Sequence, residues 1–165
     1  MMENSCLSYA ANYGLSILVV RLFSVYGSWL KKQLLWDMCS SLASGTRQLV
    51  LGGTGEELRD WIDIRDVVRA LEAAMGLASD PEAPAVFNVG SGEGTSVGRI
   101  AAMVLESWPA PAKVVFNGNA RPGNPCSLVA DGWFLQKKGF AWSVPVQSGV
   151  RDYVQWYLQS SRSDL

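Results

Sequence analysis

Short apolar runs alternate with helical segments along this chain, and that alternation constrains the fold more than any other feature. Residues 16–23 (SILVVRLF) and 85–89 (AVFNV) are rich in β-branched and apolar side chains. Runs of this kind are typical of strands covered on both faces, as in a parallel sheet. A helical segment follows at 97–105, where apolar residues recur at i, i+3, i+4, i+7 and i+8. The pattern predicts an α/β protein.

The same reading places the remaining elements and their caps. Further strands are expected at 48–51, 60–64 and 113–116, and further helices at 4–13, 30–42, 66–77, between 131 and 139, and 148–158. Asp66, Asp131, and either Thr95 or Ser96 are the expected N-caps, because short polar side chains accept hydrogen bonds from the first free N–H groups of a helix. In the helix 66–77, the side chains of Val67, Leu71, Ala74 and Met75 are expected to face inward.

Composition limits the function. The 165 residues suit a single domain, 1–165. With no histidine there is no Ser-His-Asp triad and no imidazole metal ligand, and the three widely spaced cysteines predict neither a metal site nor a disulfide framework. Free cysteines favour a reducing, cytoplasmic location. A net charge of −1 argues against nucleic acid and anionic membranes as partners, and no apolar stretch is long enough to span a bilayer.

The glycines at 90, 92 and 94 lie between an expected strand and an expected helix. Backbone N–H groups in such a turn can bind a phosphate. The spacing is one residue short of the dinucleotide fingerprint G-x-G-x-x-G, and no acidic residue follows at the distance of a ribose contact. A tight turn that needs positive φ is the simpler interpretation.

Two arginines are candidate anion contacts. Arg59 follows a glycine turn and opens the segment 59–66 (RDWIDIRD), where a fixed guanidinium could bind a phosphate in bidentate fashion. Arg121 lies in a loop, 121–125 (RPGNP), that its prolines and glycine stiffen. A solvated charged surface is the alternative for both.

Read in order, four segments resemble one known family. They are 20–27 (VRLFSVYG), 51–67 (from LGGTG through RDWIDIRDV), 87–92 (FNVGSG) and 121–124 (RPGN). The series resembles the carboxyl-terminal half of the NAD-dependent epimerase/dehydratase family, extended short-chain dehydrogenases that include UDP-glucose 4-epimerase. The resemblance covers the chain from about residue 7 to residue 157.

The resemblance implies roles for six residues. Arg59 and Arg121 would contact the diphosphate of a sugar nucleotide. Asn124 stands where the family usually has an acidic residue near the ribose, and its amide can still form hydrogen bonds. The backbone groups of Leu49 and Leu51 would flank the nucleobase. Ser24 stands where the family commonly has asparagine, so its contact with the sugar or phosphate would be shorter in reach.

The resemblance also implies what lies elsewhere. The family binds NAD at a G-x-x-G-x-x-G turn and moves protons with a Tyr-x-x-x-Lys pair, and this sequence has neither. We therefore expect no catalytic residue, no metal and no NAD bound by this chain alone, although the intact family uses NAD. Residues 1–27 and 85–107 would belong to the residual Rossmann-type sheet, and 28–84 and 108–165 mainly to the substrate-binding part.

Three functions remain open at this stage. The chain could be the portion of an enzyme that selects a nucleotide sugar, most simply a UDP-sugar, and be inactive alone. It could be a stand-alone nucleotide-sugar-binding module. It could also be a remnant without catalysis that self-associates, because strands expected to be buried would otherwise leave apolar edges open. The expected partners are accordingly a nucleotide sugar and either a second copy or a missing N-terminal half.

Overall fold

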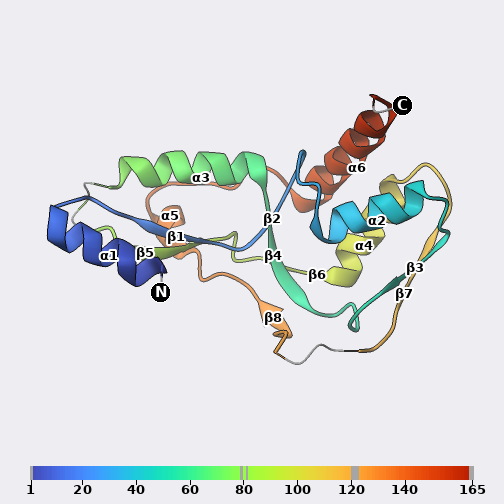
Figure 1. The fold of residues 1–165 in the computed structure, drawn as a ribbon, viewed down its shortest axis with the longest axis horizontal. Helices are drawn as coiled ribbons and strands as arrows, with labels where there is room; N and C mark the ends of the chain where they lie inside the picture. The colour runs from blue at the N-terminus through green and yellow to red at the C-terminus, as the bar shows by residue number, and fades with distance from the viewer. Residues whose placement is uncertain (1, 79, 81, 120–122, 164–165) are drawn as a thin grey trace.

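The computed structural model describes residues 2–78, 80, 82–119 and 123–163. Figure 1 shows how helices and strands alternate along this part of the chain. The elements are α1 (Met2–Tyr13), β1 (Val19–Leu22), β2 (Ser24–Tyr26), α2 (Gln33–Ala43), β3 (Gln48–Leu51), β4 (Leu58–Asp63), α3 (Ile64–Gly76), β5 (Val86–Val89), β6 (Gly94–Ser96), α4 (Val97–Ser107), β7 (Lys113–Phe116), β8 (Ser127–Leu128), α5 (Trp133–Lys137) and α6 (Val146–Ser163).

The strands form small sheets in which parallel pairing dominates. β1 pairs with β5, β2 with β4, and β3 with β7, all in parallel. β4 also pairs in parallel with β8 and antiparallel with β6. Parallel strands joined through helices confirm the expected α/β class.

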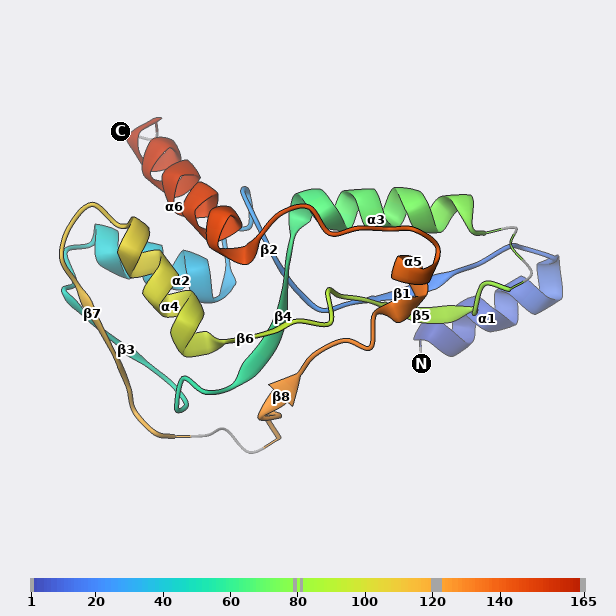
Figure 2. The same ribbon diagram turned by 180° about the vertical axis from the view of Figure 1, so that it is seen from behind.

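The molecule is elongated, with β4 crossing its middle (Figures 1 and 2). One end holds α1, β1, β5, α3 and α5; the other holds α2, α4, α6, β3 and β7. Each end has its own core. The first is centred on Ala70, Phe87 and Leu135, and the second includes Met38, Val104 and Tyr153.

α3 and α4 pack at opposite ends of the molecule (Figure 1). α4 packs against α2 and α6 at the second end. α3 packs against α5 and, through Ala70 and Ala74, beside Phe87 of β5.

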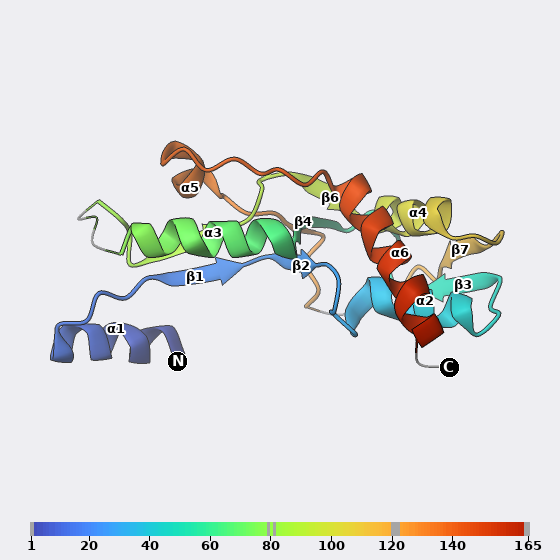
Figure 3. The ribbon, with the colours of Figure 1, turned by 90° about the horizontal axis from the view of Figure 1, so that it is seen from above.

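The segment 16–23 is less buried than its composition predicts. β1 takes only Val19–Leu22, and Leu22 is 43% exposed. β1 runs between α1 and α3 in two perpendicular views (Figures 1 and 3). Full burial was a wrong prediction because it needs neighbours on both edges and faces, and among the described residues β1 pairs with β5 alone.

The structure moves the start of α3. Asp63, not Asp66, is the N-cap, and its carboxylate accepts a hydrogen bond from the N–H of Arg65. Of the four side chains expected to face inward, Val67 and Ala74 are buried as predicted, whereas Leu71 is 36% and Met75 77% exposed. The buried face carries the small residues Ala70 and Ala74 against Phe87 and Phe134, so the prediction was wrong for Leu71 and Met75, whose apolarity does not place them in the core.

The other caps divide in the same way. Ser96 caps α4 by accepting from the N–H of Arg99, which resolves the expected choice in its favour. Gly132 occupies the N-cap position of α5 without a side-chain hydrogen bond, so the prediction for Asp131 is wrong. The last helix buries Val150, Tyr153, Val154 and Tyr157 as expected.

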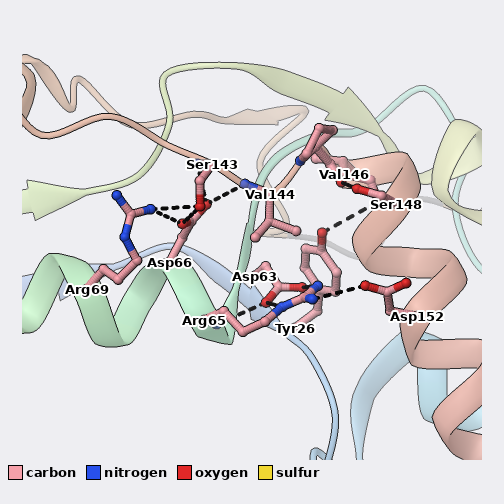
Figure 4. Close-up of polar contacts among 11 residues, drawn as sticks. Tyr26, Asp63, Arg65, Asp66, Arg69, Ser143, Val144, Val146, Ser148 and Asp152 are labelled. Atoms are coloured by element: carbon pink, nitrogen blue, oxygen red, sulfur yellow. Dashed lines mark hydrogen bonds and ion pairs between the residues drawn. The ribbon is translucent and has the colours of Figure 1, made fainter.

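Carboxylates connect the start of α3 to α6 and to the segment that precedes α6 (Figure 4). Asp63 is ion-paired with Arg65, which reaches Asp152 of α6 at 3.0 Å. Asp66 accepts hydrogen bonds from the hydroxyl and N–H of Ser143 and from the N–H of Val144. These contacts fix the orientation of α6 relative to β4.

Among the described residues, no helix combines the length and apolarity needed to cross a bilayer.

Candidate functional site

A cavity of about 410 Å³ lies where β2 and β4 meet the turn after β3. Ser24 comes from β2, Arg59 and Trp61 from β4, and Gly53 from the turn. Successive side chains of a strand point to opposite faces, so residues 59 and 61 share the face that lines this cavity. Asn124 completes the wall from the segment before β8.

Arg59 is held at the wall by two hydrogen bonds. Its guanidinium donates to the side-chain oxygen of Asn124 at 2.8 Å and to the carbonyl of Leu58 at 2.6 Å. Within the described part of the chain, no carboxylate pairs with Arg59. A guanidinium has five N–H donors, so the fork retains donors for an anion in the cavity.

The glycine turn beside Arg59 is organised by Glu57. Its carboxylate accepts from the backbone N–H of Thr54 at 2.8 Å and of Gly55 at 2.9 Å. The hydrogen bond from the N–H of Thr54 is the main reason that the pKa of Glu57 is lowered. Gly53 and Gly55 both have positive φ, +88° and +87°, which a side chain would strain. The turn is therefore a rigid wall of the cavity.

Three of the six predicted site residues meet in this cavity: Ser24, Arg59 and Asn124. Leu49 and Leu51 do not line it. The side chain of Leu49 is buried in the core, and Leu51 packs against the same cluster. Arg121 lies outside the described residues.

The turn at Gly90–Gly92 is not a phosphate cradle. The N–H groups of Ser91 and Gly92 both donate to the carboxylate of Asp60, at 2.9 Å each. Gly92 has φ +80°, and the short strand β6 separates the turn from α4. Its donors are occupied by a protein carboxylate, which confirms the tight-turn interpretation.

Sequence reasoning missed two carboxylates that shape this region, Glu57 and Asp60. Nothing in the sequence distinguishes Glu57 from the other acidic residues of the chain. Asp60 read as part of an exposed charged segment, although it is fully buried. Its place directly beside Arg59 in a strand was the available signal, because alternation sends one of the two neighbours inward.

The glycine-rich turn at 90–92 does not fit the phosphates of NAD, since its N–H donors bond to Asp60. The described residues bring no three metal-binding His, Cys, Asp or Glu side chains together. A guanidinium, a hydroxyl and amides converge on the cavity, and the Glu57 carboxylate that also lines it is bonded to the glycine turn. Arg59 is therefore the group suited to an anion, and the amides and the hydroxyl are suited to a hydroxyl-rich ligand.

Comparison with protein families matches residues 1–90 to the NAD dependent epimerase/dehydratase family. The match takes in β1, β4, α3 and the segment that carries Arg59. The chain belongs to this family.

Individual relatives agree with that assignment. The chain is 28% identical to UDP-glucose 4-epimerase of Corynebacterium glutamicum, over 95% of this chain and 51% of that protein. It is 29% identical to a probable GDP-L-fucose synthase 1 of Oryza sativa, over 72% of this chain and 35% of the relative. The chain thus spans between a third and a half of the length of these curated relatives.

Solved structures support the fold. UDP-glucuronic acid 4-epimerase of Bacillus cereus, in complex with UDP-glucuronic acid and NAD, superposes with a TM-score of 0.79 at 23% identity. The superposition covers 96% of this chain and 50% of that one. The α/β fold with parallel strands therefore corresponds to about half of an epimerase structure.

Proposed function

We propose that this chain is the sugar-nucleotide-binding portion of a nucleotide-sugar epimerase or dehydratase, and that Arg59 binds the diphosphate. The carrying observation is the pairing of Arg59 with Asn124 in the wall of a cavity that Ser24 also lines. Ser24 lies 35 positions before Arg59 and Asn124 lies 65 positions after it, and the fold places all three at one cavity. A guanidinium held in place loses little freedom on binding, which favours phosphate recognition.

The order of the four resembling segments supports a finer assignment, to the carboxyl-terminal half of the family's fold. The relatives named above are epimerases or synthases of nucleotide sugars, and a UDP-sugar is the simplest ligand for this cavity. Arg121 would supply a second phosphate contact, and backbone groups of Leu49 and Leu51 would flank the base. No catalytic base or hydride acceptor is assigned to this chain. We therefore expect it to be inactive alone, because binding by itself does not lower a chemical barrier.

Calorimetric titration with UDP and UDP-glucose tests the proposal. We expect binding by the 165-residue chain, and a loss of about 10- to 100-fold in Arg59→Ala, because a charge-assisted hydrogen bond contributes about 1.5–3 kcal/mol. Arg21→Ala is the matched control, since Arg21 pairs with Glu3 in α1 and does not line the cavity.

Two results would contradict the proposal. One is the absence of heat with millimolar UDP and UDP-glucose; the other is equal affinity in Arg59→Ala and the unmodified chain. Epimerase activity of the purified chain with added NAD would contradict the expectation that it is inactive alone. Thermal stabilisation by NAD would show a cofactor site that these residues do not reveal.

A further inference from the structure

Asp60 lies on the face of β4 opposite the cavity, with its side chain 0% exposed. It follows Arg59 directly, so the alternation of a strand sends one side chain to the cavity and the other into the protein. A buried carboxylate is costly unless hydrogen bonds satisfy it.

Four donors satisfy Asp60. Its Oδ1 accepts from the N–H of Ser91 at 2.9 Å and from the hydroxyl of Ser91 at 2.6 Å. Its Oδ2 accepts from the N–H of Gly92 at 2.9 Å and from the N–H of Ala130 at 3.1 Å. One side chain therefore joins β4, the turn after β5 and the segment after β8.

This junction leaves no room for adjustment. A Cβ at Gly90 would lie 2.5 Å from Oδ2 of Asp60 and 2.5 Å from the Cβ of Ala130. A Cβ at Gly132 would likewise meet the carbonyl oxygen of Gly90. The backbone around the carboxylate is thus fixed by contact as well as by hydrogen bonds.

The same segment carries a wall of the cavity. Ala130 comes just after β8, which pairs with β4 so that Leu128 lies opposite Arg59. Asn124, just before β8, accepts the hydrogen bond that orients the Arg59 guanidinium. The segment 124–130 is therefore held at both ends: the Asp60 carboxylate bonds to Ala130, and the Arg59 guanidinium bonds to Asn124.

We propose that Asp60 is the positioning residue of the diphosphate site: its hydrogen bond to Ala130 sets the place of β8 and Asn124, and through them the orientation of Arg59. The inference rests on the proposed function, since it assumes that Arg59 binds phosphate. It assigns Asp60 no contact with the ligand.

A second carboxylate provides a matched control. Asp66 is 1% exposed and, like Asp60, accepts from the N–H and hydroxyl of a serine and the N–H of the next residue, here Ser143 and Val144; it is also ion-paired with Arg69. It joins α3 to the segment before α6 and does not line the Arg59 cavity (Figure 4). Asp66→Asn therefore reports the effect of disturbing a buried carboxylate away from the cavity.

The experiment measures UDP affinity by calorimetry and melting temperature for both variants of the full chain. We expect Asp60→Asn to weaken UDP binding by about tenfold. An amide has one oxygen that accepts, so the donors on one of the two Asp60 oxygens lose their acceptor. Asp66→Asn should lower the melting temperature while leaving UDP affinity within about twofold. In the Arg59→Ala background, Asp60→Asn should weaken binding no further.

Contrary results are distinct. If the unmodified chain binds no UDP, the proposed function fails and this inference with it. If Arg59→Ala weakens binding and Asp60→Asn does not, only the inference fails. An equal loss from Asp60→Asn with and without Arg59, or from Asp66→Asn, would show a general structural role and overturn it.

A milder pair covers the case in which Asp60→Asn does not fold. Ser91→Ala removes one hydroxyl from Asp60, and Ser143→Ala removes the equivalent hydroxyl from Asp66. We expect UDP binding about threefold weaker in Ser91→Ala and unchanged in Ser143→Ala. Equal affinities in the two variants would overturn the inference.

Discussion

Buried carboxylates connect segments far apart in this chain. Asp60 reaches residues 31 and 70 positions away, and Asp66 reaches residues 77 and 78 positions away. In both, a serine supplies its N–H and hydroxyl and the next residue supplies another N–H. Such complete hydrogen bonding makes burial of the charge tolerable, and loss of the acceptor leaves several donors unsatisfied.

Asp66 gives a pH-dependent prediction. Burial by itself raises the pKa of Asp66, but the hydrogen bonds from Ser143, Val144 and Arg69 outweigh it, so the pKa is lowered below its ordinary value. A lowered folded-state pKa contributes stability above the unfolded-state value, about 3.9, and that stability is lost as the pH falls through the folded-state pKa.

Asp66→Asn should therefore reduce the free energy of unfolding by about 2 kcal/mol at pH 7. The difference from the unmodified chain should shrink below about pH 4, as the native carboxylate becomes protonated. Urea unfolding between pH 2.5 and 7 measures this difference. A constant difference over that range would contradict the assignment.

At the level of elements, α4 begins with a side-chain N-cap and α2 does not. Ser96 extends its hydroxyl to the N–H of Arg99, whereas Lys32 precedes α2 without any side-chain cap. The cap matters because α4 packs against both α2 and α6 in the second core and supplies Ile100 and Val104 to it.

We expect Ser96→Ala to lower the free energy of unfolding by about 1 kcal/mol, because one N–H at the helix start loses its acceptor. Lys32→Ala should change it by less than about 0.5 kcal/mol, since no cap is lost. Chemical denaturation of both variants measures the effect. Equal stabilities would mean that the Ser96 hydrogen bond contributes nothing to α4.

At the level of the whole molecule, the first end is incompletely covered. Among the described residues, α1 buries no side chain and β1 pairs on one edge only. α3 exposes a stripe of Ile64, Val68, Leu71 and Met75 at helical spacing. Open strand edges and apolar helix faces promote association.

We expect light scattering of the purified chain to give a mass above 17.9 kDa. Replacing Val68 and Met75 together by glutamate should reduce the mass toward that of a monomer, because charges on the α3 stripe oppose apolar contact. The matched control is the replacement of Val50 and Val115 by glutamate, exposed at the other end. A strictly monomeric unmodified chain would contradict self-association.

Local sequence determined most elements of this protein. β3 and β7 begin and end at the expected residues, and the buried face of α6 is as expected, because strand and helix periodicities are local properties. Family segments in order identified the epimerase/dehydratase relationship and pointed to Arg59.

Tertiary structure alone decided which residues meet. It placed Asn124 against Arg59, turned the N–H groups of the Gly90 turn toward Asp60, and left Leu71 and Met75 of α3 exposed. Each outcome depends on contacts between segments distant in the sequence, where close packing and the need to satisfy buried polar groups select one arrangement. Periodicity says which side chains can share a face, but not what that face will touch.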